Sequence, residues 1–299
     1  MATQEQINVG AELVSNSFKG SEPFFIGRNG STEITVFFYW LNNRASGWPW
    51  PTNLVKSLEI HSGVWPSTAV DEWCTHYQIS LVQLTGLAAG WYKPLADAEL
   101  KFVNNHNSGA FKVPLRSLEP YYVEPSLRWT AELADKDVAV VTSFTKTIQH
   151  QLDRVDPLKI WSGVEAPETI LPPTTRWHLV KSYFPPNISE DDPTGWASIG
   201  INSWEAAVNH LVDEVLKTGA KTAIIGCGAL GMIIGGRLRK KGISSILMGG
   251  AIQVLFGIRG KRWENHEIIS KFWNDNWIYP LDSERPPNAG MIEGACYWE

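Results

Sequence analysis

Cysteine is scarce in this sequence, and the few cysteines present are widely separated. The 299 residues contain three, Cys74, Cys227 and Cys296, and no two of them form a Cys-x-x-Cys pair. An odd number of distant cysteines suits neither a disulfide framework nor a zinc site. We therefore expect neither of these in the chain, and we expect a reducing compartment.

Segments that direct a chain to a membrane are also missing. Residues 1–10 are polar and have neither the basic start nor the apolar centre of a signal peptide. The most apolar run, residues 223–234, is shorter than a membrane span and rich in glycine. The net charge of −5 gives no bulk attraction for nucleic acid or anionic lipid. We expect a soluble cytoplasmic protein with no membrane span and no nucleic-acid partner.

Several motifs of familiar enzymes do not occur. The sequence has no Gly-x-x-x-x-Gly-Lys-Ser/Thr loop, which excludes a Walker-type NTPase. It has no Gly-x-Ser-x-Gly and no His-Glu-x-x-His motif, and its seven histidines show no metal-ligand spacing. These absences disfavour a serine hydrolase or a zinc protease of the usual kinds.

Tryptophan, in contrast, is abundant, with fifteen residues. The chain is 43% apolar and 19% charged, which is typical of a globular protein. Its length fits one large α/β domain, and we expect a single domain over residues 1–299 with two βαβ-like halves, about 1–155 and 156–299. The tryptophans either pack in the core or form aromatic surfaces for sugar-like ligands.

The order of apolar and polar segments predicts strands that alternate with helices. Gly242 follows a basic run, which is typical of a helix C-terminus. Alternation of this kind predicts a Rossmann-like, doubly wound and mostly parallel sheet with flanking helices. Residues 48–91 are expected to be rich in loops, and residues 160–204 to form a long connection. The predicted strands are 23–27, 137–144, 177–181, 221–225 and 244–248, and the predicted helices begin at Ser31, Thr145 and about Leu230.

One glycine-rich turn has the context of a nucleotide-binding loop. Residues 226–231 read Gly-Cys-Gly-Ala-Leu-Gly, after a strand and before a helix, so the turn can approach a pyrophosphate closely. An NAD site would also need a carboxylate at the end of the next strand, but residues 247–250 read Leu-Met-Gly-Gly. A phosphate ligand, a dinucleotide and a structural turn all stay open. Cys227 lies where thiol pKa values fall, so it is either a nucleophile or a packing residue.

Charged residues near two of the turns are the remaining candidates. Residues 257–263 carry three cations within four residues, which suits a diphosphate or a solvated turn. Glu33 follows the first strand, where it is either a catalytic group or a cap of its own helix.

These residues resemble a known family. Residues 25–33 are similar to the N-terminal strand–loop–helix motif of glycosyltransferases of the GT-D fold class, which usually reads Arg, any residue, Gly, Asp, Gly, Glu. The likeness spans roughly residues 23–298 and is loosest between 45 and 115. Further similar segments are 118–122, 140–144 with Thr147 and Gln151, 226–231, 249–258, 260–263 and 294–298.

The resemblance implies a Rossmann-like enzyme that transfers a sugar from a nucleotide diphosphate sugar to a glycan hydroxyl. In the family the Asp and Glu of this motif are associated with a divalent metal, Mn²⁺ or Mg²⁺. Here Ser31 stands at the Asp position and only Glu33 is kept, so Arg28, Lys261 and Arg262 are an alternative way to neutralise the diphosphate. Glu33 is expected to bind a metal or to deprotonate the acceptor.

The expected site has two parts. Five tryptophans fall between residues 48 and 91, and four of them, Trp48, Trp50, Trp65 and Trp73, are assigned to the carbohydrate acceptor; Trp91 is the fifth. An NAD(P)-dependent oxidoreductase and a non-catalytic nucleotide-sugar or carbohydrate-binding module remain as alternatives. The residues expected to bind the donor are Gly27, Arg28, Asn29, Gly30, Ser31, Ser143, Phe144, Thr147, Gly226, Cys227, Gly228, Ala229, Leu230, Gly249, Gly250, Gln253, Lys261 and Arg262.

Overall fold

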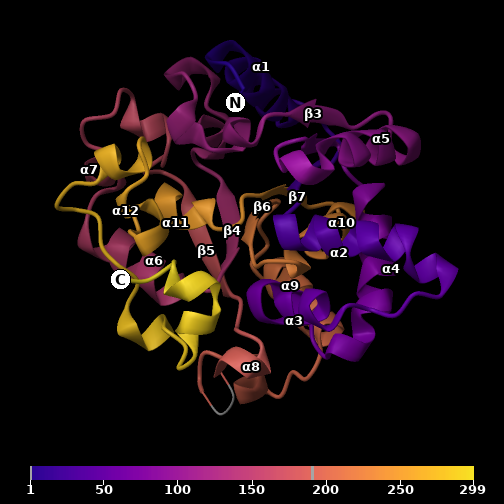
Figure 1. Ribbon diagram of the computed structural model, residues 1–299. Coiled ribbons are helices and arrows are strands. Elements are labelled where there is room, and N and C mark those ends of the chain that lie inside the picture. The colour runs from indigo at the N-terminus through magenta and orange to yellow at the C-terminus, as the bar shows by residue number, and fades with distance from the viewer. Residues whose placement is uncertain (1, 190–191) are drawn as a thin grey trace.

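A seven-stranded sheet forms the centre of the protein (Figure 1). The computed structural model describes residues 2–189 and 192–299. All neighbouring strands are parallel, in the order β3-β2-β1-β7-β6-β4-β5. The strands are β1 (Phe25–Arg28), β2 (Gly86–Ala88), β3 (Phe111–Val113), β4 (Asp137–Thr142), β5 (Arg176–Lys181), β6 (Thr222–Gly226) and β7 (Ser244–Leu247).

Helices connect these strands and cover both faces of the sheet. None of the described helices is both long and apolar enough to cross a membrane. The longer helices are α1 (Gln4–Ser17), α2 (Ser31–Asn42), α3 (Thr52–Ser62), α4 (Val70–Leu81), α5 (Ala96–His106), α6 (Thr145–Arg154), α9 (Trp204–Lys217) and α10 (Leu230–Lys240). The short ones are α7 (Pro157–Ile160), α8 (Pro186–Ser189), α11 (Ala251–Leu255) and α12 (Lys261–Glu264).

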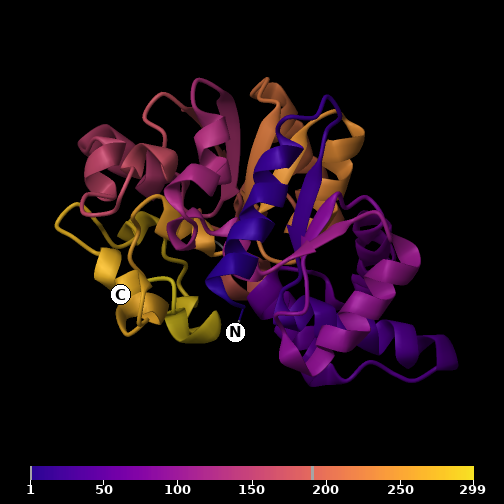
Figure 2. The same cartoon turned by 90° about the horizontal axis from the view of Figure 1, so that it is seen from above.

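The alternation of side chains along the strands divides the core in two. On β4, Ala139 and Val141 pack on the face that α2, α3, α4, α5, α9 and α10 cover. Val138 and Val140 point to the other face, where α1, α6, α11 and the C-terminal residues pack. Figures 1 and 2 both show α2–α4 to one side of the sheet and the C-terminal segment to the other.

The predicted fold class is confirmed: the protein is α/β, with a Rossmann-like parallel sheet and flanking helices. The predicted strands coincide with β1, β4, β5, β6 and β7 to within a few residues. The predicted helix starts at Ser31, Thr145 and Leu230 are those of α2, α6 and α10. The C-terminal signal of α10 is also confirmed, since Gly242 adopts φ +79° just after three cations in the last turn.

The expectation of a loop-rich region at residues 48–91 was wrong. This part of the chain contains α3, α4 and β2, and α5 and β3 follow directly. The strands β2 and β3 have three residues each, so they are too short to show a period. The first turns of α3, α4 and α5 also have no side-chain cap that could have marked their start.

Candidate functional site

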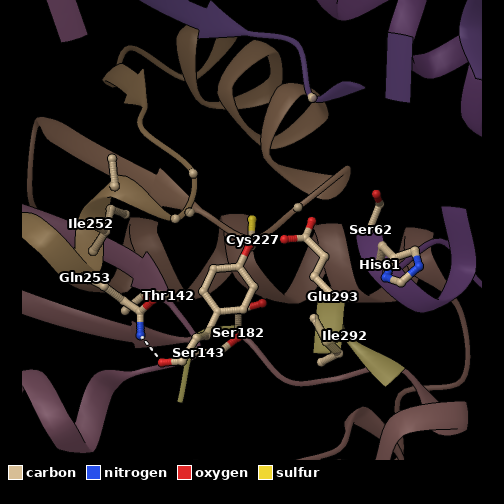
Figure 3. A pocket seen from close by; sticks show the side chains of 18 of the residues that line it. His61, Ser62, Thr142, Ser143, Ser182, Cys227, Ile252, Gln253, Ile292 and Glu293 are labelled. Atoms are coloured by element: carbon tan, nitrogen blue, oxygen red, sulfur yellow. Dashed lines mark hydrogen bonds between the residues drawn. The ribbon is translucent and has the colours of Figure 1, made fainter. Parts of the chain in front are cut away.

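A cavity of about 410 Å³ opens at the carboxyl edge of the sheet (Figure 3). The segments that follow β1, β4, β5, β6 and β7 line it, as expected where the loops of parallel strands meet at one edge. In Figure 3, Thr142, Ser143 and Gln253 lie on one side, His61 and Ser62 lie on the other, and Glu293 projects between them.

Two arginine side chains lie beside the turn between β7 and α11. The Nη1 atom of Arg28, at the end of β1, donates to the carbonyl of Met248 over 3.0 Å. A Cβ atom on Gly249 would lie 3.4 Å from the Arg28 guanidinium, and one on Gly250 would lie 3.4 Å from Nη1 of Arg262. The glycine pair therefore separates two guanidinium groups that both line the cavity.

Aromatic rings hold both arginines in place. The Arg28 guanidinium lies 5.6 Å from the ring centre of Trp91. Arg262 lies 4.9 Å from the ring of Tyr297 and 5.3 Å from that of Trp263. Cation–π contacts of this kind restrict the side chains and leave the N–H groups available. The arrangement suits an anion with several oxygens, such as a diphosphate.

Glu119 is a carboxylate of the cavity that faces these cations. It lies between two short 3₁₀ segments, Leu115–Leu118 and Pro120–Tyr122. Burial raises the pKa of Glu119 to about 7, and the charges of Arg28, Arg116 and Arg262 partly oppose this rise. A carboxyl group with a pKa near 7 exchanges protons readily at neutral pH, which is the property of a general base.

Two buried polar atoms that line the cavity have no partner among the described residues. These are the hydroxyl of Tyr121 and Oε1 of Gln253, and Gln253 is only 1% exposed. The Nε2 atom of Gln253 donates to the carbonyl of Tyr297 over 3.2 Å, which fixes the orientation of the amide. Buried polar atoms are normally paired, so these two are candidates to bind a ligand.

Glu33 lines the cavity but also covers the start of its own helix. Its carboxylate folds back over Gly30, the N-cap of α2, so closely that a Cβ atom there would collide with it. Burial raises the pKa of Glu33, and its own backbone N–H and the Ser62 side chain, which favour the charged form, partly oppose this rise. A carboxylate in the first turn of α2 also lies at the positive end of the helix dipole, which fits the alternative role that the sequence left open.

The glycine-rich turn between β6 and α10 is covered by the protein itself. The carbonyl of Ser62, at the end of α3, accepts from the N–H of Ala229 over 2.9 Å. A Cβ atom on Gly228, which has φ +58°, would lie 2.7 Å from that same carbonyl oxygen. In dinucleotide-binding folds the second glycine allows close approach of the pyrophosphate. Here the backbone of α3 takes that position, which argues against the dinucleotide alternative.

The N–H groups at the start of α6 are also occupied by the protein itself, here by a buried carboxylate. The carboxylate of Glu284, which is 0% exposed, accepts from the N–H groups of Lys146 and Thr147 and from the Thr147 hydroxyl. Lys181 donates to it over 3.0 Å. Thr147 is therefore committed to this internal network and does not line the cavity.

The C-terminal segment, residues 292–298, forms one wall of the cavity in a strained conformation. Three successive residues have left-handed backbone angles: Glu293 (φ 47°), Gly294 (φ 67°) and Ala295 (φ 60°). For the two that are not glycine this costs roughly 1 kcal/mol or more each. Contacts with α12 hold the segment, since Arg262 N–H donates to the Cys296 carbonyl over 3.0 Å and Arg262 pairs with Glu293 at 3.6 Å.

Asn29 does not line the cavity, but it holds one of the side chains that do. It is 1% exposed, and its amide donates to Glu99 over 2.5 Å and accepts from the Tyr77 hydroxyl. Its carbonyl accepts from Nε1 of Trp91 over 3.0 Å, so this network fixes the ring that packs on Arg28. Gly27 is also internal, since a Cβ atom on it would meet Leu84 and Met232.

Of the residues predicted to bind the donor, most converge on this cavity. Five of them do not line it. Lys261 is exposed at the surface outside the cavity, and the other four lie behind its wall: Gly27, Asn29, Thr147 and Ala229. Cys227 lines the cavity, but burial raises the pKa of its thiol, contrary to the lowering expected at a helix start. The residues that the structure brings together are Arg28, Gly30, Ser31, Glu33, Ser143, Phe144, Gly226, Cys227, Gly228, Leu230, Gly249, Gly250, Gln253 and Arg262.

The four tryptophans assigned to an acceptor do not line the cavity. Trp65 is 3% exposed and Trp73, on α4, is fully buried, because both belong to the core cluster that α3 and α4 help to form. Trp48 is exposed at the surface, and Trp50 packs against Tyr39 beside Arg44. The tryptophans that do line the cavity are Trp91, Trp196 and Trp263.

Several cavity residues were missed by sequence reasoning. Glu119 lies within a segment that carried the family resemblance, but nothing in its spacing marked it as a functional group. Glu293 and Tyr297 come from a segment without regular helices or strands. The local signal that could have marked Glu119 is its place directly before Pro120, in a short segment bounded by Pro114 and Pro120.

The residues of the cavity do not fit a divalent metal at the position that the resemblance implies. Ser31 supplies no carboxylate, and the Glu33 carboxylate is folded back against Gly30 at the start of its own helix. Within the described residues, a group with metal-ligand spacing is Glu72, His76 and Glu205, and none of these lines the cavity.

Comparisons with families of known proteins, with curated proteins and with solved structures find no match. Fold and site together define the class: a Rossmann-like α/β protein with a cavity of mixed charge at the carboxyl edge of its sheet.

Proposed function

We propose that the protein is a glycosyltransferase that takes a nucleotide diphosphate sugar as its donor. The observation that carries this proposal is the pair Arg28 and Arg262, on the two sides of the Gly249–Gly250 turn at the carboxyl edge of a parallel sheet. Two guanidinium groups in this position suit the two phosphates of such a donor. The resemblance of residues 25–33 to GT-D glycosyltransferases supports the same class.

The proposed reaction uses Glu119 as the general base. An acceptor hydroxyl attacks the anomeric carbon, and its proton passes to the Glu119 carboxylate. The bond between the anomeric carbon and the diphosphate oxygen breaks, and the bonding electrons leave with the nucleoside diphosphate. Negative charge grows on the leaving diphosphate, so Arg28 and Arg262 stabilise the transition state more than the ground state.

Polar atoms of the wall supply further contacts for a sugar. Oε1 of Gln253 and the Tyr121 hydroxyl have no partner within the described part of the chain. In the proposed complex Oε1 accepts a hydrogen bond from a sugar hydroxyl, and the Tyr121 hydroxyl donates or accepts one. Aromatic rings such as Trp91 and Tyr297 suit the apolar face of a sugar ring.

A screen of nucleotide sugars tests this function. A donor that binds only the folded protein raises its melting temperature by mass action. We then expect the selected donor to release free nucleoside diphosphate when candidate glycans are added. A donor that binds without any release of nucleotide, whichever acceptor is offered, would identify a binding module. No shift with any nucleotide sugar would contradict the proposal.

A further inference from the structure

We infer that this site neutralises the donor diphosphate with Arg28 and Arg262 and without a divalent metal. The inference rests on the proposed function and adds a property that the family resemblance does not imply. Three features of the cavity support it: the position of the Glu33 carboxylate over the start of its own helix, the cations around Glu119, and the placement of the two arginines.

The first feature is that the kept glutamate of the motif folds back over the start of its own helix. The Glu33 carboxylate lies so close to Gly30 that a Cβ atom there would collide with it. A metal would require this carboxylate to leave the helix start and to become fully ionised, although burial favours its protonated form. Ser31 offers only a hydroxyl as a second ligand at this position.

The second feature is that the other carboxylates of the cavity already have cationic neighbours. Glu293 pairs with Arg262 at 3.6 Å. Glu119 experiences the charges of Arg28, Arg116 and Arg262. A divalent cation bound to either carboxylate would lie close to fixed guanidinium groups, and like charges repel strongly in a partly buried site.

The third feature is that contacts within the protein already hold both arginines where they can bind a diphosphate. Arg28 is held by the Met248 carbonyl and the ring of Trp91, and Arg262 by the ring of Tyr297. The glycines between them leave no side chain that would block an anion. Two arginines supply the same total charge as one Mg²⁺ ion, together with directed N–H donors.

The test measures the binding of inorganic pyrophosphate and of uridine and guanosine diphosphates by calorimetry, once in excess EDTA and once in Mg²⁺. We expect the Kd of at least one of these anions to agree within about threefold between the two conditions. Arg28→Ala and Arg262→Ala should each weaken binding about 10- to 100-fold, the usual effect of removing a charged hydrogen bond. Lys271→Ala, which removes an exposed cation that does not line the cavity, should leave Kd unchanged.

The outcomes separate this inference from the proposed function. Binding or sugar transfer that occurs only with Mg²⁺ or Mn²⁺ would overturn the inference and leave the transferase proposal standing. Absence of binding in both conditions would overturn both. Arg28→Lys and Arg262→Lys keep the charge but lose the planar fork, so they should bind more weakly than the parent and better than the alanine variants. Thermal melts of each variant confirm that it is folded.

Discussion

Two glycine-containing turns lie side by side at the carboxyl edge of the sheet, and they are used differently. The β6–α10 turn, Gly226–Gly228, packs under the end of α3, where Ser62 accepts from the N–H of Ala229. The β7–α11 turn, at Gly249 and Gly250, faces two arginines and the cavity. Glu33 lies near Ser62, the residue that covers the first turn. Glu119 lies near the arginines that face the second turn.

The difference teaches how a glycine motif should be interpreted. A glycine at such a turn indicates that something approaches the backbone closely. At Gly228 the approaching group is the backbone of the same chain, and at Gly249 it is an arginine that faces a ligand cavity. The better match to a nucleotide motif, residues 226–231, is therefore the turn with less room for a nucleotide.

The largest effect should distinguish the two glutamates. Glu119→Gln removes the proposed base, so we expect turnover to fall by at least about 100-fold. Glu33→Gln keeps a side-chain oxygen at the start of α2, so turnover should stay within about tenfold of the parent. The measurement is kcat with the donor that the screen selects. Equal losses in the two variants, with both folded, would assign Glu33 to the chemistry as well.

The pKa of Glu119 also predicts a pH dependence. The pKa in the folded state, about 7, lies above the ordinary value of 4.5, so the folded protein holds this proton more tightly. Its contribution to stability is present below pH 4.5 and is lost as the pH rises through about 7. In the same range kcat/KM should rise, because the base becomes ionised. Urea unfolding at several pH values should show this loss in the parent and not in Glu119→Gln.

The second largest effect compares the two turns directly. Gly228 and Gly249 have nearly equal φ angles, +58° and +60°, so alanine causes similar backbone strain at each. Gly228→Ala adds a collision with the Ser62 carbonyl and should cost about 2–4 kcal/mol of unfolding free energy. Gly249→Ala meets the Arg28 guanidinium at 3.4 Å and should cost only about 1 kcal/mol, while pyrophosphate binding weakens. Equal stability losses would show that the β6–α10 turn is not closed as described.

A smaller effect is expected at Gln253. Gln253→Met keeps the shape of the side chain and removes the unpaired Oε1 atom along with one hydrogen bond to Tyr297. The unfolding free energy should therefore change by less than about 1 kcal/mol. Donor affinity should fall about 5- to 20-fold, while pyrophosphate affinity stays the same, because the amide is proposed to contact the sugar. A loss of pyrophosphate affinity would instead place Gln253 at the phosphates.

The smallest effect concerns the strained wall. Ala295 has φ 60°, a conformation that glycine adopts freely. Ala295→Gly should relieve this strain and raise the unfolding free energy by up to about 1 kcal/mol, less the entropy that glycine loses on folding. Thermal melts check this. A clear destabilisation would mean that packing of the Ala295 methyl group outweighs the strain.

The sequence predicted the fold well where elements are long and regular. The apolar run of β4 and the end of α10 just before Gly242 carry local signals, and both were located. The site was predicted only in part, because its residues depend on contacts far along the chain. Arg262 was identified from a local run of cations and Arg28 from the family resemblance, but nothing near Gly228 indicates that Ser62 covers it. Trp73 was assigned to an acceptor although its ring packs in the core.

The strained C-terminal wall also has a consequence for the way the site is made. Residues 292–298 supply Glu293 and Tyr297, whereas Arg28 ends β1 and Glu33 lies near the start of α2. During synthesis Arg28 leaves the ribosome long before Tyr297, whose ring packs on Arg262. A nascent chain that has not yet reached Trp298 holds only part of the cavity wall. The complete pocket therefore forms after the last strand of the sheet has been made, so a growing chain does not acquire it early.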